Sequence, residues 1–131
     1  MKNRDGQLDL SATDISNFLG CRHRIGLEMS AAAGEIAKPV FDDPELEALF
    51  RRGLEHERRY VASLAAGRGS LVNLSEETEP ERAASLTIEA MAAGADVIVQ
   101  GALRHERWQG RPDVLVRAST ASRFGAWSYE V

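Results

Sequence analysis

The sequence predicts an α+β fold, with helices dominating the first half of the chain and strands gathered towards the end. Apolar residues recur at helical spacing between positions 44 and 67. Apolar and polar residues then alternate from Val97 towards Leu103, and a second apolar run covers 114–116. Because 44% of the 131 residues are hydrophobic, the chain can build one core. We therefore expect N-terminal helices packed on a three- to four-stranded mixed or antiparallel sheet.

Two short helices are expected first. Ser11 can cap the first one, and Asp14 lies in its first turn, where the helix dipole favours negative charge. Gly20 is expected to end this helix. A second helix should run over 21–33 and stop at Gly34.

A long helix is the clearest element of the sequence. Asp43 is a candidate N-cap, and Pro44 suits the first helical position. The segment before it, 37–43, contains Pro39 and is expected to be a loop. The helix should end near Gly67. Its apolar face is predicted to consist of Leu46, Leu49, Phe50, Leu54, Val61 and Leu64.

The second half reads as a strand, a helix and a meander of adjacent strands. A turn is expected at Gln109-Gly110, and a loop at 118–123. The elements are a strand at 70–74, a helix at 79–93, and strands at 97–103, 114–116 and 126–131.

Composition narrows the class of protein. The chain has no apolar run near 18 residues and no apolar signal core in its polar start, so we expect a cytoplasmic protein that does not enter membranes. The net charge of −4 does not point to nucleic acid, although a local basic patch is compatible with it. Cys21 is the only cysteine and is expected to be a small buried residue; an iron–sulfur cluster needs about four thiolates.

Three side chains are candidates for chemistry. His56 lies on the long helix, Asp113 follows Pro112 ahead of an apolar run, and Glu130 lies on the last strand. Each has an ordinary explanation: a solvated histidine, a turn aspartate and a solvent-facing carboxylate. Together, His56 and Asp113 could bind Mg²⁺ or Mn²⁺, which would activate water for phosphodiester hydrolysis. Gly53 is expected to let the helix approach the sheet near His56.

The order of these motifs resembles the RecB-like branch of the PD-(D/E)XK nucleases. That branch has helices, then Gly-x-x-His, then Gly-x-x-Asp on a hairpin, then a strand, and residues 53–56, 110–113 and 126–131 follow this order. Segments 10–14 and 18–23 resemble its N-terminal signature, which CRISPR-associated RecB-like exonucleases share. Segments 94–100 and 125–131 are similar to a bacterial group that carries this domain at the N-terminus of a longer protein.

The resemblance implies a restriction-endonuclease-like core, incomplete at its C-terminal end. Residues 1–131 would be the N-terminal part of a single nuclease domain, with a helical part, 1–67, followed by strand, helix and meander over 68–131. His56 would be the motif histidine, and Asp113 the central ligand of Mg²⁺ or Mn²⁺. The parent protein would cut DNA, single- or double-stranded, in DNA repair, and would carry a downstream domain such as a helicase or an RNase H-like domain.

The chain departs from the family at the next motif, an acidic residue, a spacer and a lysine. No such pair follows Asp113. We expect it just beyond Val131, with Glu130 beside the site; the alternative is that Glu130 is itself the catalytic acid. The family's later helix with a glutamine motif is missing too. Residues 1–131 alone should therefore bind metal weakly and cut poorly or not at all.

Arginines are the candidates for DNA contact. A solvated face is the plainer explanation, but in the family these helices flank the DNA path, so phosphate contacts are the alternative. Trp108 and Trp127 are expected to be packing or rim residues. The nucleic-acid-binding candidates are Arg22, Arg24, Arg52, Arg59 and Arg111.

Two other functions compete with a nuclease. The first is a non-catalytic nucleic-acid-binding or protein-interaction module with a degenerate nuclease core. The second is an assembly domain, because the last strand would leave an exposed edge that can pair with a partner.

Overall fold

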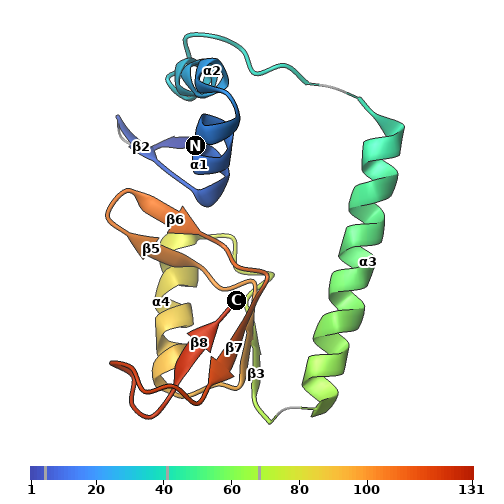
Figure 1. The fold of residues 1–131 in the computed structure, drawn as a ribbon, viewed down its shortest axis with the longest axis vertical. Helices are drawn as coiled ribbons and strands as arrows, with labels where there is room; N and C mark the ends of the chain where they lie inside the picture. The colour runs from blue at the N-terminus through green and yellow to red at the C-terminus, as the bar shows by residue number, and fades with distance from the viewer. Residues whose placement is uncertain (5, 41, 68) are drawn as a thin grey trace. The chain divides into compact units, whose positions relative to one another are not determined.

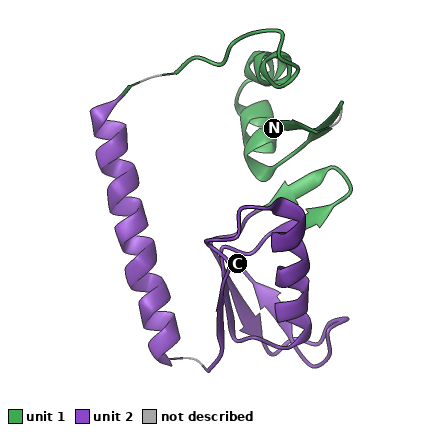
Figure 2. Cartoon of the chain, turned by 180° about the vertical axis from the view of Figure 1, so that it is seen from behind, with its two compact units in different colours: residues 1–42, 104–110 green, residues 43–103, 111–131 purple. Residues whose placement is uncertain are grey.

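The computed structural model describes residues 1–4, 6–40, 42–67 and 69–131. The chain is divided into two compact units (Figure 2). Unit 1 consists of 1–42 and 104–110, and unit 2 of 43–103 and 111–131. The described part is mixed α+β, as predicted, with four helices and several small sheets (Figure 1).

Unit 1 combines two helices with two hairpins. Its helices are α1 (Ala12–Gly20) and α2 (Arg22–Ala32), and its first hairpin pairs β1 (Lys2–Arg4) with β2 (Gln7–Asp9). The second hairpin pairs β5 (Leu103–His105), whose first residue belongs to unit 2, with β6 (Trp108–Gly110).

A buried carboxylate and the backbone tie these pieces of unit 1 together. Asp9 is buried, and its Oδ2 lies 3.3 Å from Arg4 Nε and 3.4 Å from Arg104 Nη2. The N–H of Leu10 donates to the Arg107 carbonyl at 2.7 Å. Because Arg104 and Arg107 belong to the second hairpin, residues almost 100 positions apart in sequence are joined here.

Unit 2 is built on a four-stranded mixed sheet. The strands are β3 (Leu71–Asn73), β4 (Val97–Val99), β7 (Val114–Ala118) and β8 (Ser128–Glu130), in the order β3-β4-β7-β8. β3 runs parallel to β4, and the other neighbours are antiparallel. The helix α4 (Pro80–Ala92) connects the two parallel strands, as parallel pairing requires.

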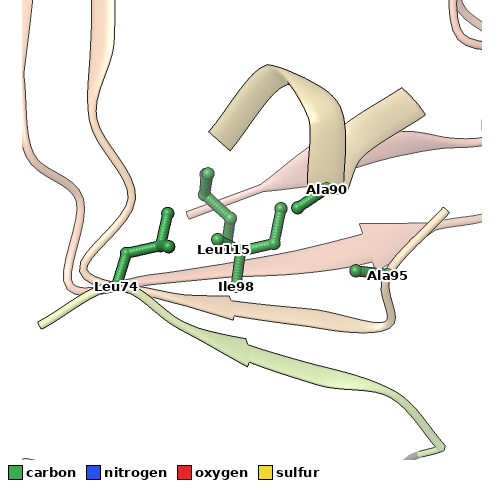
Figure 3. Packing of buried hydrophobic residues seen from close by; sticks show 5 residues of the cluster. All are labelled: Leu74, Ala90, Ala95, Ile98 and Leu115. Atoms are coloured by element: carbon green, nitrogen blue, oxygen red, sulfur yellow. The ribbon is translucent and has the colours of Figure 1, made fainter. Parts of the chain in front are cut away.

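Alternation along β4 gives the sheet two apolar faces. Ile98 packs on one side in a cluster with Leu74, Ala90, Ala95 and Leu115, beneath α4 (Figure 3). Val97 and Val99 face the other side, where they join Val114, and Val61 and Leu64 of α3 (Pro44–Gly67) pack against them. Unit 2 therefore places its sheet between α4 and the C-terminal half of α3.

The N-terminal half of α3 is not covered. Leu49 and Phe50 are each 64% exposed, and Leu54 is 55% exposed. The apolar face predicted for this helix is thus used only from Val61 onwards. Along the described parts of the chain, no helix is long and apolar enough to cross a membrane.

The sequence located the helix ends well. The predicted caps are confirmed: Asp14 forms a capping box with Ser11, and the Asp43 carboxylate accepts the N–H groups of Glu45 and Leu46. The predicted loop 37–43 includes residue 41, which lies outside the described residues; 37–40 and 42–43 form neither helix nor strand.

Several local predictions were wrong. Gln109 and Gly110 belong to β6, and the Gln109 N–H bonds to the Leu10 carbonyl. The turn lies three residues earlier, at Glu106 and Arg107, with Glu106 at φ 53°. The strand predicted over 97–103 ends at Val99. The β1–β2 hairpin was not predicted, because its six strand residues carry little apolar alternation.

The predicted environments of two small residues, Cys21 and Gly53, were also wrong. Cys21 is exposed rather than buried, because it lies at the junction of α1 and α2. Gly53 does not lie against the sheet: a Cβ built there would meet nothing within 4 Å.

Candidate functional site

An open pocket of about 1220 Å³ in unit 2 collects the predicted site residues. α3 lines it with His56 and Glu57, the residue just before β7 is Asp113, and the end of β8 contributes Glu130. The structure thus brings His56, Asp113 and Glu130 into one pocket from three separate elements. His56, Asp113 and Glu130 are all exposed, so a ligand can reach them from solvent.

Strand geometry explains why Glu130 faces this pocket. Successive side chains of a strand point to opposite faces of the sheet. Tyr129 packs on the α4 side, where its hydroxyl donates to the Ala95 carbonyl at 2.7 Å. Glu130, the next residue, therefore points to the α3 side.

Trp127, the residue before β8, attaches this end of the strand to α4. Its indole N–H donates to the Met91 carbonyl at 3.0 Å, and its ring lies against Gly94 and Gly125. This agrees with the interpretation of Trp127 as a packing residue.

Asp113 is held by a residue that the sequence did not single out. Gln100, which follows β4, donates from its side-chain Nε2 to Asp113 Oδ1 at 3.0 Å and to Glu57 Oε1 at 2.7 Å. Its backbone N–H donates to the Asp113 carbonyl at 2.8 Å. Gln100 also adopts φ 52°, which is uncommon for a residue other than glycine. One side chain therefore connects α3 with the start of β7.

Sequence reasoning missed both Glu57 and Gln100. Glu57 was visible only as the neighbour of His56 in a charged helix, and Gln100 only as the end of a segment similar to a nuclease group. Gln100 bonds to Glu57, 43 residues earlier, and to Asp113, 13 residues later, so local spacing in the sequence could not reveal these contacts.

The donor chemistry of this pocket suits a hard divalent cation. Carboxylate oxygens and one imidazole are ligands that Mg²⁺ or Mn²⁺ accepts. Throughout 1–4, 6–40, 42–67 and 69–131, no three His, Cys, Asp or Glu side chains form a group able to hold a metal ion. Mg²⁺, however, is commonly held by one or two carboxylates, with water and substrate phosphate as the other ligands. A site based on Asp113 and one further ligand therefore fits this chemistry.

Two of the arginines predicted to bind nucleic acid, Arg111 and Arg59, bond to other groups of the protein. Arg111 Nη2 donates to the carbonyls of Leu74 and Glu77 at 2.8 and 2.9 Å, so it ties the segment between β3 and α4 to the start of β7. Arg59 pairs with Glu55 one helical turn away.

The remaining candidates are exposed on helices. The Arg22 guanidinium lies 5.4 Å from the centre of the Phe18 ring, in cation–π range. Arg24 is exposed on α2, and Arg52 is exposed on α3. Arg22 and Arg24 belong to unit 1, whereas Arg52 lies beside the pocket residue Gly53 in unit 2.

Comparison with known proteins returned no match to this chain among family models, curated proteins or solved structures.

Proposed function

We propose that this chain is the N-terminal part of a RecB-like nuclease domain of the PD-(D/E)XK superfamily. In the intact parent it would hydrolyse phosphodiester bonds of DNA with Mg²⁺ or Mn²⁺. The observation that carries the proposal is that His56 and Asp113, 57 positions apart in the sequence, line one pocket. A mixed sheet with helices on both faces also suits a restriction-endonuclease-like core.

The proposed division of labour follows from the side-chain chemistry. Asp113 would be the central cation ligand and His56 a second one, and the ion would activate water and offset the charge that develops on the phosphate. Glu130 would lie beside the ion or would supply the acid of the next motif. Since residues 1–131 contain no acid-x-Lys pair after Asp113, these residues alone should cut DNA poorly.

Calorimetric titration with Mn²⁺ tests the proposal. His56→Ala and Asp113→Ala should each weaken binding at least tenfold, because each removes a direct ligand. His23→Ala and Asp42→Ala are matched controls, since both residues are exposed and outside the pocket, and they should bind as the parent chain does. If His56→Ala and Asp113→Ala bind Mn²⁺ as tightly as the parent, the proposed centre is wrong.

A non-catalytic nucleic-acid-binding module is the second candidate. It is favoured by the absence, within the described residues, of any group of three or more potential ligands. Such a module would bind DNA equally well with EDTA and with Mn²⁺, and Asp113→Ala would not weaken it. A nuclease centre instead predicts that DNA binding strengthens with Mn²⁺ in the parent chain and not in Asp113→Ala.

A further inference from the structure

The two proposed cation ligands lie on different elements, so something must hold those elements in register. His56 belongs to α3, and Asp113 precedes β7. The apolar contact between α3 and the sheet begins at Val61, about one turn after His56. In the N-terminal direction along the same helix, the side chain of Leu54 is already 55% exposed. The helix therefore leaves the sheet close to His56.

Gln100 lies where the helix leaves the sheet, because it bonds to Glu57, the residue after His56. Its Nε2 has two N–H groups, one for the Glu57 carboxylate on α3 and one for the Asp113 carboxylate. Ionised carboxylates only accept hydrogen bonds, so the amide must present its nitrogen, not its oxygen, to both. The chemistry therefore determines the orientation of the amide.

The backbone of Gln100 adds to this arrangement. Its N–H donates to the Asp113 carbonyl at 2.8 Å, and Gln100 has φ 52°. A non-glycine residue in this conformation costs on the order of 1 kcal/mol or more. The residue thus contacts Asp113 through both main chain and side chain while it holds Glu57.

We propose that Gln100 is a positioning residue of this centre: by donating to Glu57 and Asp113 at once, it holds the helix that carries His56 against Asp113, the residue just before β7. This inference rests on the proposed function, because it assigns a role toward the same cation. Glu57 acts in it as a hydrogen-bond acceptor and not as a cation ligand.

Mn²⁺ titration of position 100 tests the inference. Gln100→Gly removes the amide, and glycine accepts φ 52° without strain, so the fold should be kept. We expect binding to weaken about tenfold, as for the loss of other residues that orient a metal ligand. Glu106→Gly is the matched control, because Glu106 has φ 53° in the β5–β6 turn, and it should bind Mn²⁺ as the parent does.

Position 57 separates positioning from direct ligation. Glu57→Ala removes the acceptor and should weaken binding about as much as Gln100→Gly, and the double variant should be no weaker than either single one. Glu57→Gln keeps an acceptor oxygen without the charge and should bind within about twofold of the parent. Glu55→Ala, on the same helix outside the pocket, should have no effect.

The outcomes distinguish this inference from the proposed function. If Asp113→Ala abolishes Mn²⁺ binding and Gln100→Gly does not weaken it, the centre stands and the positioning role is wrong. If Glu57→Gln loses as much affinity as Glu57→Ala, Glu57 acts through its charge, and the role given to Gln100 is overturned. If the parent chain itself does not bind Mn²⁺, the proposed function and this inference both fail.

Discussion

The hydroxyl of Thr87 accepts a hydrogen bond from the backbone N–H of Ala102 at 2.8 Å and donates one to the Ala83 carbonyl at 2.7 Å. Thr87 is fully buried in α4, and Ala102 lies beyond the end of β4. A single hydroxyl therefore satisfies a buried amide of the segment that leaves the sheet after Gln100.

Thr87→Val should lower the free energy of unfolding by about 1–3 kcal/mol, because it keeps the shape of the side chain and leaves the Ala102 N–H without an acceptor. Urea denaturation followed by circular dichroism measures this loss. Thr120→Val, at an exposed position, serves as control and should change stability little. Equal stability of Thr87→Val and the parent would contradict the buried hydrogen bond.

Gly53→Ala should stabilise the protein by about 1 kcal/mol, since glycine is a poor helix former and an added Cβ would meet no atom. The midpoint of urea unfolding should rise. Gly101→Ala provides the contrast, because a Cβ there would lie 3.2 Å from Thr87 Cγ2 and 3.3 Å from Leu115 Cδ1, so it should destabilise. A loss of stability in Gly53→Ala would mean that α3 approaches another part of the protein at this residue.

Asp14 should make stability depend on acid pH. Burial raises the pKa of Asp14, but hydrogen bonds from the N-terminal ammonium and from Ser11 outweigh it, so the pKa lies below its ordinary value of 3.8. A lowered folded-state pKa means that Asp14 stabilises the fold fully above pH 3.8 and loses this effect as the pH falls through the folded-state value.

The matching variant is Asp14→Asn. The difference in unfolding free energy between the parent and Asp14→Asn should be largest near neutral pH and should shrink on acidification below pH 3.8. Urea unfolding at several pH values measures it. A difference that stays constant down to pH 2 would show that the carboxylate charge does not contribute.

Arg111→Ala should reduce stability by about 1.5–3 kcal/mol, because its guanidinium donates to two backbone carbonyls. Arg52→Ala should leave stability nearly unchanged, since Arg52 is exposed on α3. Thermal unfolding of the two variants compares them directly. If Arg111→Ala is as stable as Arg52→Ala, Arg111 remains available for phosphate.

Arg52→Ala should instead weaken DNA binding uniformly across sequences, as expected for a phosphate contact. The slope of log affinity against log salt concentration should fall by about one unit. Fluorescence anisotropy with a labelled oligonucleotide at several salt concentrations measures the slope. Arg123→Ala, in the exposed segment before β8, is the control, and an unchanged slope in Arg52→Ala would remove Arg52 from the interface.

The sequence by itself determined where two of the helices of this protein begin. Ser11 and Asp43 begin helices because caps act on amides within three residues, and the start of α3 at Pro44 follows from the same short-range chemistry. It also indicated His56 and Asp113 as candidate ligands of one cation, although only through the order of motifs.

The tertiary structure decided what these side chains meet. Asp113 and Val114 both line the pocket, although neighbouring residues of a strand point to opposite faces. Because Asp113 precedes β7, strand alternation does not apply to it and could not predict this placement. The hydrogen bond from Gln100 to Glu57 and the open space beside Gly53 could not be predicted from the sequence either. The reason is that such contacts join residues distant in sequence, and these come together only when the helices and strands pack.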